Sequence, residues 1–237
     1  MDKSATFAWL KSSGLKGETE GLIMAAQDQS LPTKAQQARV YKCTNDPKCR
    51  LCTEYDETID HLVSGCPMLA RTEYTHRHDK VGKYIHWKIC QHFQIPTDDL
   101  WYKHQPQPVT EQDQVKILWD FPIITDKEIK ANRPDIVLIN NSDKTCLLID
   151  MTVPSDNNIS LKEYEKLAKY KDLEIEIQKM WKVKTTVVPV VLGALGAIHV
   201  GLKNHISKIP GDIAPEQLQK IALLGTAHIL RKSLSLK

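Results

Sequence analysis

Three cysteines and one histidine stand close together in the chain, in the pattern Cys49-x2-Cys52-x8-His61-x4-Cys66. Zinc takes four tetrahedral sulfur or nitrogen ligands, and a Cys-x2-Cys turn brings two sulfur atoms to one metal without strain. The His-x4-Cys pair can supply the other two ligands, so the pattern predicts a structural zinc knuckle with no open position for catalysis. The alternative is three free thiols and an unrelated histidine. Cys43 is a candidate substitute ligand.

The composition is that of a globular protein, with 237 residues of which 41% are hydrophobic and 26% are charged. This length predicts one domain, or one domain with a small attached module. The formal net charge of +3 neither requires nor excludes a nucleic-acid partner. Six cysteines, three of them in the knuckle pattern, indicate metal ligands rather than a secreted disulfide framework. We therefore expect an intracellular protein, in which Cys90 and Cys146 are small buried apolar side chains.

The longest apolar stretch runs from Val187 to Leu202 and contains Pro189 and three glycines. It is about 16 residues long, whereas a membrane-spanning helix needs roughly 18 or more. The stretch therefore predicts a buried strand that continues into a helix, and we expect no membrane partner.

A proline-containing linker, residues 105–108, divides the chain. Before it, residues 1–42 are expected to form a helical segment, and residues 43–104 to hold the zinc knuckle and a basic helix over 72–93. After it, residues 109–237 alternate between strand-like and helix-like patterns. Strands are predicted at 115–124, 135–139, 146–153 and 185–192, and helices at 161–181, 198–209 and 215–234. Strands that alternate with helices in this way predict an α/β domain.

The segment that follows the knuckle is locally basic. Within residues 67–92, five cations stand against two acidic residues, with four histidines and several aromatic residues among them. Cations follow phosphates, and aromatic faces stack on bases, so the segment predicts nucleic-acid contact. The alternative is a solvated helix face with its aromatic side chains in the core. The residues that we expect to contact nucleic acid are Arg71, Arg77, His78, Lys80, Lys83, Lys88 and Arg133.

Two aspartates mark the ends of two neighbouring predicted strands. Asp135 opens one strand, and Asp150 lies near the end of the next. If residues 140–144 form the loop, Asp135 falls opposite Ile149, and a bulge or a four-residue loop is then needed to bring the carboxylates together. Two carboxylates on adjacent strands suit Mg²⁺, which activates water and stabilises a leaving phosphate oxygen. The alternative is that both are turn residues at strand ends.

Lysines follow on one face of the next predicted helix. Lys162, Lys166 and Lys169 stand at i, i+4 and i+7, and Tyr170 comes one turn after Lys166. A lysine at this place can stabilise charge on a phosphate under attack. The alternative is a solvent-facing helix whose charges pair with one another.

In this order the motifs resemble the C-terminal end of the non-LTR retrotransposon polyproteins that carry a restriction-like endonuclease. The motifs are the knuckle, Arg77-His78-Asp79, Arg133-Pro134-Asp135, Asp150 and Lys166-x2-Lys169-Tyr170. Further similar stretches are Glu57 to Val63, Ile117 to Phe121, Leu223 to Ala227 and Ile229 to Arg231. The resemblance covers nearly the whole chain.

This resemblance implies a PD-(D/E)xK restriction-endonuclease-like core that nicks target DNA with Mg²⁺ or Mn²⁺, so that the exposed 3′ end primes reverse transcription. By position, Asp135 and Asp150 would bind this metal. Lys166 or Lys169 would be the catalytic lysine, with Tyr170 beside the site. The implied location is the nucleus, and the implied partners are target DNA, the RNA of the element and an upstream reverse-transcriptase domain.

The sequence departs from the family in two respects. Thr152 stands where the wider nuclease superfamily has its motif lysine, which in the retrotransposon group is on the following helix. The reverse-transcriptase domain is not in this sequence, so we expect a fragment or a separate descendant, in which residues 1–42 resemble the linker to the polymerase. The second hypothesis is a nucleic-acid-binding module that keeps the fold but does not cleave.

Overall fold

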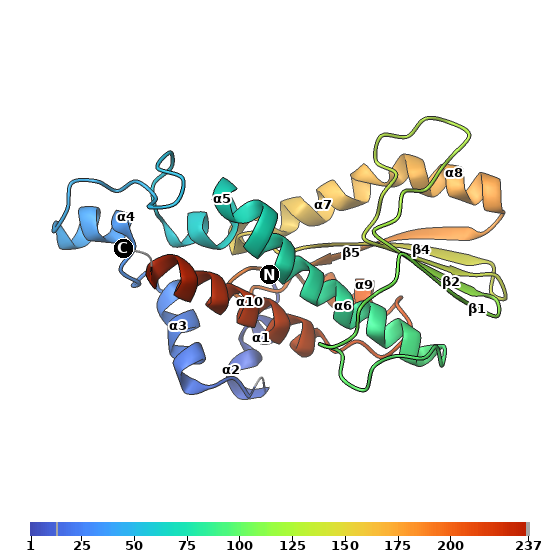
Figure 1. The fold of residues 1–237 in the computed structure, drawn as a ribbon, viewed down its shortest axis with the longest axis horizontal. Coiled ribbons are helices and arrows are strands. Elements are labelled where there is room, and N and C mark those ends of the chain that lie inside the picture. The colour runs from blue at the N-terminus through green and yellow to red at the C-terminus, as the bar shows by residue number, and fades with distance from the viewer. Residues whose placement is uncertain (13, 236–237) are drawn as a thin grey trace.

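A five-stranded sheet lies between two groups of helices in the computed structural model, which describes residues 1–12 and 14–235 (Figure 1). The strands are β1 Val109–Gln112, β2 Val115–Trp119, β3 Ile136–Asn140, β4 Thr145–Thr152 and β5 Lys184–Val191. They lie in the order β1-β2-β3-β4-β5, so each strand is hydrogen-bonded to its neighbour in the sequence. The first four are antiparallel and β5 is parallel to β4. The predicted α/β class is confirmed at this level.

The helices of the crossover from β4 to β5 lie on one side of the sheet, and the remaining long helices lie on the other side (Figure 1). The crossover contains the 3-10 turn η4 Asp156–Asn158 and the helices α7 Ile159–Lys169 and α8 Lys171–Trp181. The other side is covered by α6 Thr75–His92, α9 Leu202–Ile206 and α10 Pro215–Ser235. Because β4 and β5 are parallel, the end of β4 and the start of β5 lie at opposite ends of the sheet, and the chain needs a crossover to connect them.

Side chains of the sheet alternate between these two helical layers, as the twofold period of a strand requires. On β3, Ile136 and Leu138 join the core under α6 and α10, whereas Val137 and Ile139 join a second core under α8. On β4, Leu148 belongs to the second core. Since both faces are buried, the central strands contain near-continuous apolar runs.

The N-terminal third of the chain consists of short helices. They are α1 Lys3–Phe7, α2 Trp9–Ser12, α3 Gly17–Gln27, α4 Lys34–Gln36, α5 Pro67–Leu69 and the π-helical turns η1 Gln37–Tyr41, η2 His61–Gly65 and η3 Ala70–Tyr74. Trp9 and Ile23 are fully buried against Leu223 and Ala227 of α10. The core under α6 also contains Cys49 and Cys66, so the cysteine-rich segment and the sheet share one apolar core.

Helix α6 packs closely on the sheet because Gly82 has no side chain. A Cβ atom built at Gly82 would lie 2.6 Å from Met151 Cε and 2.6 Å from Trp119 Cη2. Met151 of β4 and Trp119 of β2 thus occupy the space that a side chain at position 82 would need. This contact sets the distance between α6 and the sheet.

The strand predictions are confirmed within a few residues, with two differences among the strands and one among the helices. Residues 120–124 are not part of β2, and β1 was not predicted because its four residues are polar or exposed. The single helix predicted over 161–181 is two helices that meet at Tyr170. Among the described residues, none of the helices is long and apolar enough to cross a membrane.

Candidate functional site

The register of β3 and β4 places the two predicted metal-binding aspartates opposite each other. Asn140 pairs with Thr145, and the ladder ends where Ile136 pairs with Ile149. Asp135 lies immediately before β3, and continuing the register by one position sets it against Asp150. The loop that was expected at residues 140–144, with Asp135 opposite Ile149, is therefore wrong by one residue.

A four-residue turn, residues 141–144, explains this register. Asn140 stays in the strand, and its side-chain oxygen accepts hydrogen bonds from the backbone N–H groups of Ser142 and Asp143 at 3.0 and 3.2 Å. Lys144 closes the turn with a positive φ of 53°. Asp150 points to the face on which α7 and α8 lie, whereas Asp135, immediately before β3, contacts His78 of α6 at the end of the sheet.

Asp150 is surrounded by groups from the crossover helices. Its side chain is 2% exposed, and Lys166 Nζ forms an ion pair with its Oδ2 atom. Tyr170 Oη lies 2.5 Å from Oδ1, and Lys169 Nζ lies 3.7 Å from the same oxygen. Burying a carboxylate without such partners is costly, so the helix residues predicted as catalytic are those that stabilise Asp150.

Tyr170 reaches Asp150 because the helix ends there and begins again. Its backbone has φ −101° and ψ 8°, between α7 and α8, and its ring is fully buried. The hydroxyl accepts a hydrogen bond from Lys169 Nζ at 2.7 Å, and it can donate its single proton to Asp150 or to the Arg133 carbonyl at 3.0 Å. Burial and the charge of Asp150 raise the pKa of Tyr170 above its usual value, so the hydroxyl keeps its proton.

Asp135 is held by α6. His78 Nε2 lies 3.1 Å from Asp135 Oδ2, and the backbone N–H of Met151 donates to the same oxygen at 2.5 Å. Burial alone would lower the pKa of His78, but its hydrogen bonds to Asp135 and Asp79 raise that pKa to about 10. Burial would likewise raise the pKa of Asp135, yet His78 lowers it overall. The two side chains therefore form a charged pair.

A cleft of about 570 Å³ opens beside Asp135. Its lining joins the end of the sheet to the segment around and after the cysteine cluster, and it includes Ser64. Its lining includes His78, Trp119, Asp135, Ser155 and Lys162. A ligand in this cleft would contact Asp135 directly, whereas Asp150 is covered by its lysine and tyrosine partners.

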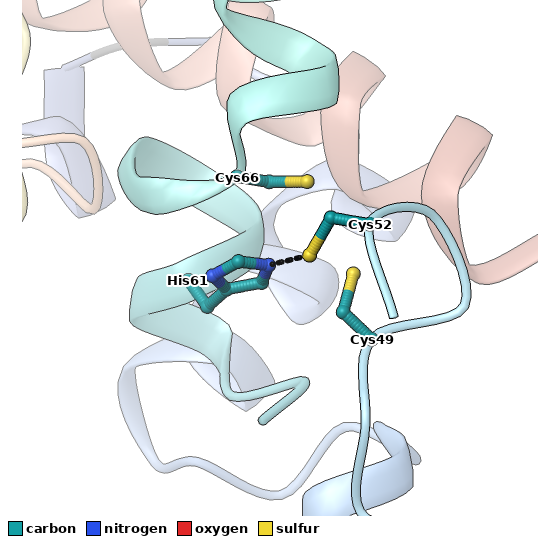
Figure 2. Close-up of side chains that lie close together, drawn as sticks. All are labelled: Cys49, Cys52, His61 and Cys66. Atoms are coloured by element: carbon teal, nitrogen blue, oxygen red, sulfur yellow. Dashed lines mark hydrogen bonds between the residues drawn. The ribbon is translucent and has the colours of Figure 1, made fainter. Parts of the chain in front are cut away.

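The cysteine–histidine cluster forms as the spacing predicts (Figure 2). Cys49 and Cys52 come from one loop, His61 begins η2, and Cys66 lies in the turn after it. Their ligand atoms lie within 4.8 Å of one another, and Cys52 Sγ lies 3.4 Å from His61 Nε2. In a tetrahedral site with zinc-like bonds, a sulfur and a nitrogen lie about 3.5 Å apart. These four side chains can hold one structural metal ion.

Hydrogen bonds around the cluster hold its ligands in place. The Tyr74 hydroxyl accepts from the backbone N–H of Cys66 and lies 3.0 Å from the carbonyl oxygens of His61 and Leu62. Glu57 is fully buried and accepts hydrogen bonds from the side chain and backbone of Arg50. Cys43, the candidate substitute, is exposed and belongs to neither group of metal-binding side chains found among the described residues.

The predicted nucleic-acid residues occupy two different environments. Arg77 is only 2% exposed and donates hydrogen bonds to Thr226 Oγ1 at 2.8 Å and to the Val153 carbonyl at 3.0 Å. Its guanidinium joins α6 to α10 and to the residue after β4, and the side chain forms part of the wall of the cleft beside Asp135. The others lie at least partly on the surface, and they are Arg71, His78, Lys80, Lys83, Lys88 and Arg133.

Two features of the site were missed by the sequence analysis. His78 was expected to contact nucleic acid but pairs with Asp135, and only the tertiary packing of α6 brings the two together. Cys90 is buried, as predicted, but it also belongs to a second group that could hold a metal ion, His86, Cys90 and His104, which was not predicted. The signal for this group was available, because His86 and Cys90 are spaced i, i+4 on one helix.

Neither a protein-family model nor a curated protein matches this sequence. A function for this chain must therefore be inferred from the chemistry of the two clusters and of the aspartate site.

Proposed function

We propose that this chain is a Mg²⁺-dependent DNA endonuclease with a PD-(D/E)xK-like core, supported by a structural zinc site. One observation supports this most: Asp135, immediately before β3, and Asp150, in the neighbouring strand β4, lie at the same end of the sheet, with Lys166 beside Asp150. Two carboxylates and a lysine at one end of a sheet are the groups that metal-assisted phosphodiester hydrolysis requires.

Mg²⁺, or Mn²⁺ in its place, would be held by Asp135 and Asp150 and would supply an activated water and charge neutralisation at the phosphate. Among the described residues these aspartates belong to no group of three or more metal-binding side chains, so the phosphate and water would complete the coordination. Lys166 compensates the Asp150 charge in this conformation. Lys166 would be the residue that stabilises charge on the phosphate under attack.

His78 is the positioning residue for Asp135 in this proposal. Its ring holds one carboxylate oxygen at 3.1 Å, and the Met151 N–H holds the same oxygen at 2.5 Å. Both contacts are to Oδ2, and because Asp135 lines the cleft, its other oxygen would be the one that binds a cation. A carboxylate that is fixed in this way loses less conformational entropy when a ligand binds.

The zinc site and the basic residues of α6 would hold the DNA. Zinc is the metal that best fits three thiolates and one imidazole in a closed tetrahedral site. The partly exposed cations after the knuckle, with Arg133, which pairs with Asp120 of the cleft lining, would contact phosphates. Phosphate contacts of this type orient the duplex without reading its sequence.

In its biological setting, we propose that the nick primes reverse transcription during retrotransposition. This setting rests on the motif order that resembles the C-terminal end of retrotransposon polyproteins. Target DNA, the RNA of the element and a reverse-transcriptase domain would then be the partners, and the nucleus would be the location.

One observation favours a second candidate, an inactive nucleic-acid-binding module. Both oxygens of Asp150 are already occupied, by Lys166 and by Tyr170, and the side chain is 2% exposed. If this ion pair persists on DNA, the chain would bind nucleic acid through its basic surface without cutting.

A nicking assay on supercoiled plasmid separates the two candidates. The endonuclease nicks the plasmid with Mg²⁺, loses the activity in EDTA, and loses it in Asp135→Asn. The absence of nicking together with salt-sensitive DNA binding would instead support the binding module.

A further inference from the structure

A second cluster of metal-binding side chains lies inside the molecule, away from both sites described above. His86 and Cys90 stand one turn apart on α6, and His104 comes from the connection between α6 and β1. All three side chains are buried, with exposures of 1%, 1% and 7%. Burying two imidazoles and a thiol together has no packing advantage over apolar side chains, so the cluster calls for a chemical reason.

We propose that His86, Cys90 and His104 form a second metal site, which takes a divalent ion of the zinc class. One imidazole nitrogen of each histidine and the cysteine sulfur lie within 4.8 Å of one another. A thiolate with two neutral imidazoles suits zinc, whereas magnesium and calcium prefer oxygen ligands.

The distances need little adjustment to accept the ion. Cys90 Sγ lies 3.4 Å from His86 Nδ1, and a tetrahedral zinc site separates sulfur and nitrogen by about 3.5 Å. His86 Nδ1 lies 2.8 Å from His104 Nε2, and these nitrogens would move apart to about 3.3 Å. The same atoms share a hydrogen bond in this conformation, so the ion would take the place of one proton between them. His104 lies in a loop, which permits this small shift.

The fourth ligand position faces a cavity. A space of about 380 Å³ adjoins the cluster, and its lining includes Cys90, Thr97, Asp98, His104 and Gln105. Three protein ligands with water or a small ligand at the fourth position is a common arrangement for zinc. The polar lining provides room and hydrogen-bond partners for such a water molecule.

The site would fasten the connection between α6 and β1. This connection is already attached by Trp87, whose Nε1 donates to the Asp98 carbonyl at 2.8 Å, and by the edge-on contact of Trp101 with Tyr84. A metal bridge from α6 to His104 adds a bond near the other end of the segment. The inference depends on neither the nuclease activity nor the knuckle.

Metal analysis of the purified full chain tests the proposal. Zinc, copper, iron and nickel are measured by mass spectrometry after dialysis against metal-free buffer, with circular dichroism to confirm folding. We expect about two zinc ions per chain in the wild type, and about one in both Cys90→Ala and His104→Gln. The matched control, Cys146→Ala, changes a buried thiol outside both clusters and keeps about two ions.

Cys52→Ser keeps the outcomes separable, because it removes a ligand of the knuckle alone. If this variant loses an ion that Cys90→Ala retains, and the reverse also holds, then two independent sites exist. Unchanged zinc content in folded Cys90→Ala and His104→Gln would overturn the proposal, whatever the knuckle binds. Copper or iron at this position would overturn the assignment to zinc.

Discussion

The Tyr170 hydroxyl lies 2.5 Å from Asp150 Oδ1, at the point where α7 ends and α8 begins. The residue at the helix break is therefore the one that contacts the buried carboxylate. Lys166, on the preceding turn of α7, pairs with the other oxygen of Asp150. The crossover thus completes the site that the ends of β3 and β4 begin.

Lys166 rather than Lys169 is expected to be the catalytic lysine. Lys166→Met removes the ion-pair partner of a carboxylate that is 2% exposed, and should lower the free energy of unfolding by about 3 kcal/mol. Lys169→Met removes a side chain that is 45% exposed and 3.7 Å away, and should cost less than about 1 kcal/mol. Nicking well below the melting temperature should be lost in the first variant only. Loss of nicking in Lys169→Met alone would reverse the assignment.

Removal of the Tyr170 hydroxyl should lower the stability of the fold while the buried ring stays in place. Tyr170→Phe keeps the buried ring but removes a hydrogen bond to Asp150, which should lower the free energy of unfolding by about 1–2 kcal/mol. Urea denaturation measures this change, and Tyr164→Phe on the exposed face of α7 is the matched control. Equal stability of both variants would show that the Tyr170 hydrogen bond contributes nothing.

The parts of the site formed by residues close in sequence were predictable, because a short segment between two ligands allows the chain few conformations. The spacing of Cys49, Cys52, His61 and Cys66 predicted a cluster that the structure confirms. The apolar runs of β3, β4 and β5 predicted those strands to within a few residues, since buried strands are apolar on both faces.

The parts that depend on tertiary packing were not predictable in this way. A single residue in the turn after Asn140 decides whether Asp135 faces Asp150 or Ile149, and the sequence allows either loop. Arg77 is buried because Gly225 of α10 leaves room for it: a Cβ at Gly225 would lie 2.5 Å from Arg77 Cγ. That contact joins distant parts of the chain, so the local basic character of α6 did not reveal it.

Loss of one knuckle ligand should release metal and unfold the segment around it. Cys52→Ser should lower bound zinc by about one ion and expose residues 43–74 to proteolysis, because structural zinc contributes folding energy. Cys43→Ser changes an exposed cysteine outside the cluster and should alter neither quantity. Limited proteolysis with metal analysis checks both. Zinc that stays bound to Cys52→Ser and leaves Cys43→Ser would place Cys43 among the ligands.

The ion pair between Glu57 and Arg50 should make stability depend on pH. Burial alone would raise the pKa of Glu57, but the hydrogen bonds from Arg50 lower it overall. A lowered carboxyl pKa contributes stability above the unfolded value of about 4.3, and this is lost as the pH falls through the folded value. Glu57→Gln should therefore cost about 3 kcal/mol at pH 7 and progressively less below about pH 4.

Chemical denaturation at several pH values measures this difference between the wild type and Glu57→Gln. Glu54→Gln, on the exposed part of the same loop, is the matched control and should follow the wild type at every pH. A cost for Glu57→Gln that stays constant from pH 7 to pH 3.5 would contradict the account.

The rate of plasmid nicking by Asp150→Asn tests the central claim most directly. The substitution removes a charge that we propose binds Mg²⁺ but leaves the surface cations in place, so DNA affinity measured in parallel should change by less than about twofold. The account predicts a loss of nicking of at least about a thousandfold in Asp150→Asn. Asp172→Asn, which changes an exposed aspartate on α8, should cut at the wild-type rate. Mg²⁺-dependent nicking that persists in Asp150→Asn would contradict the account.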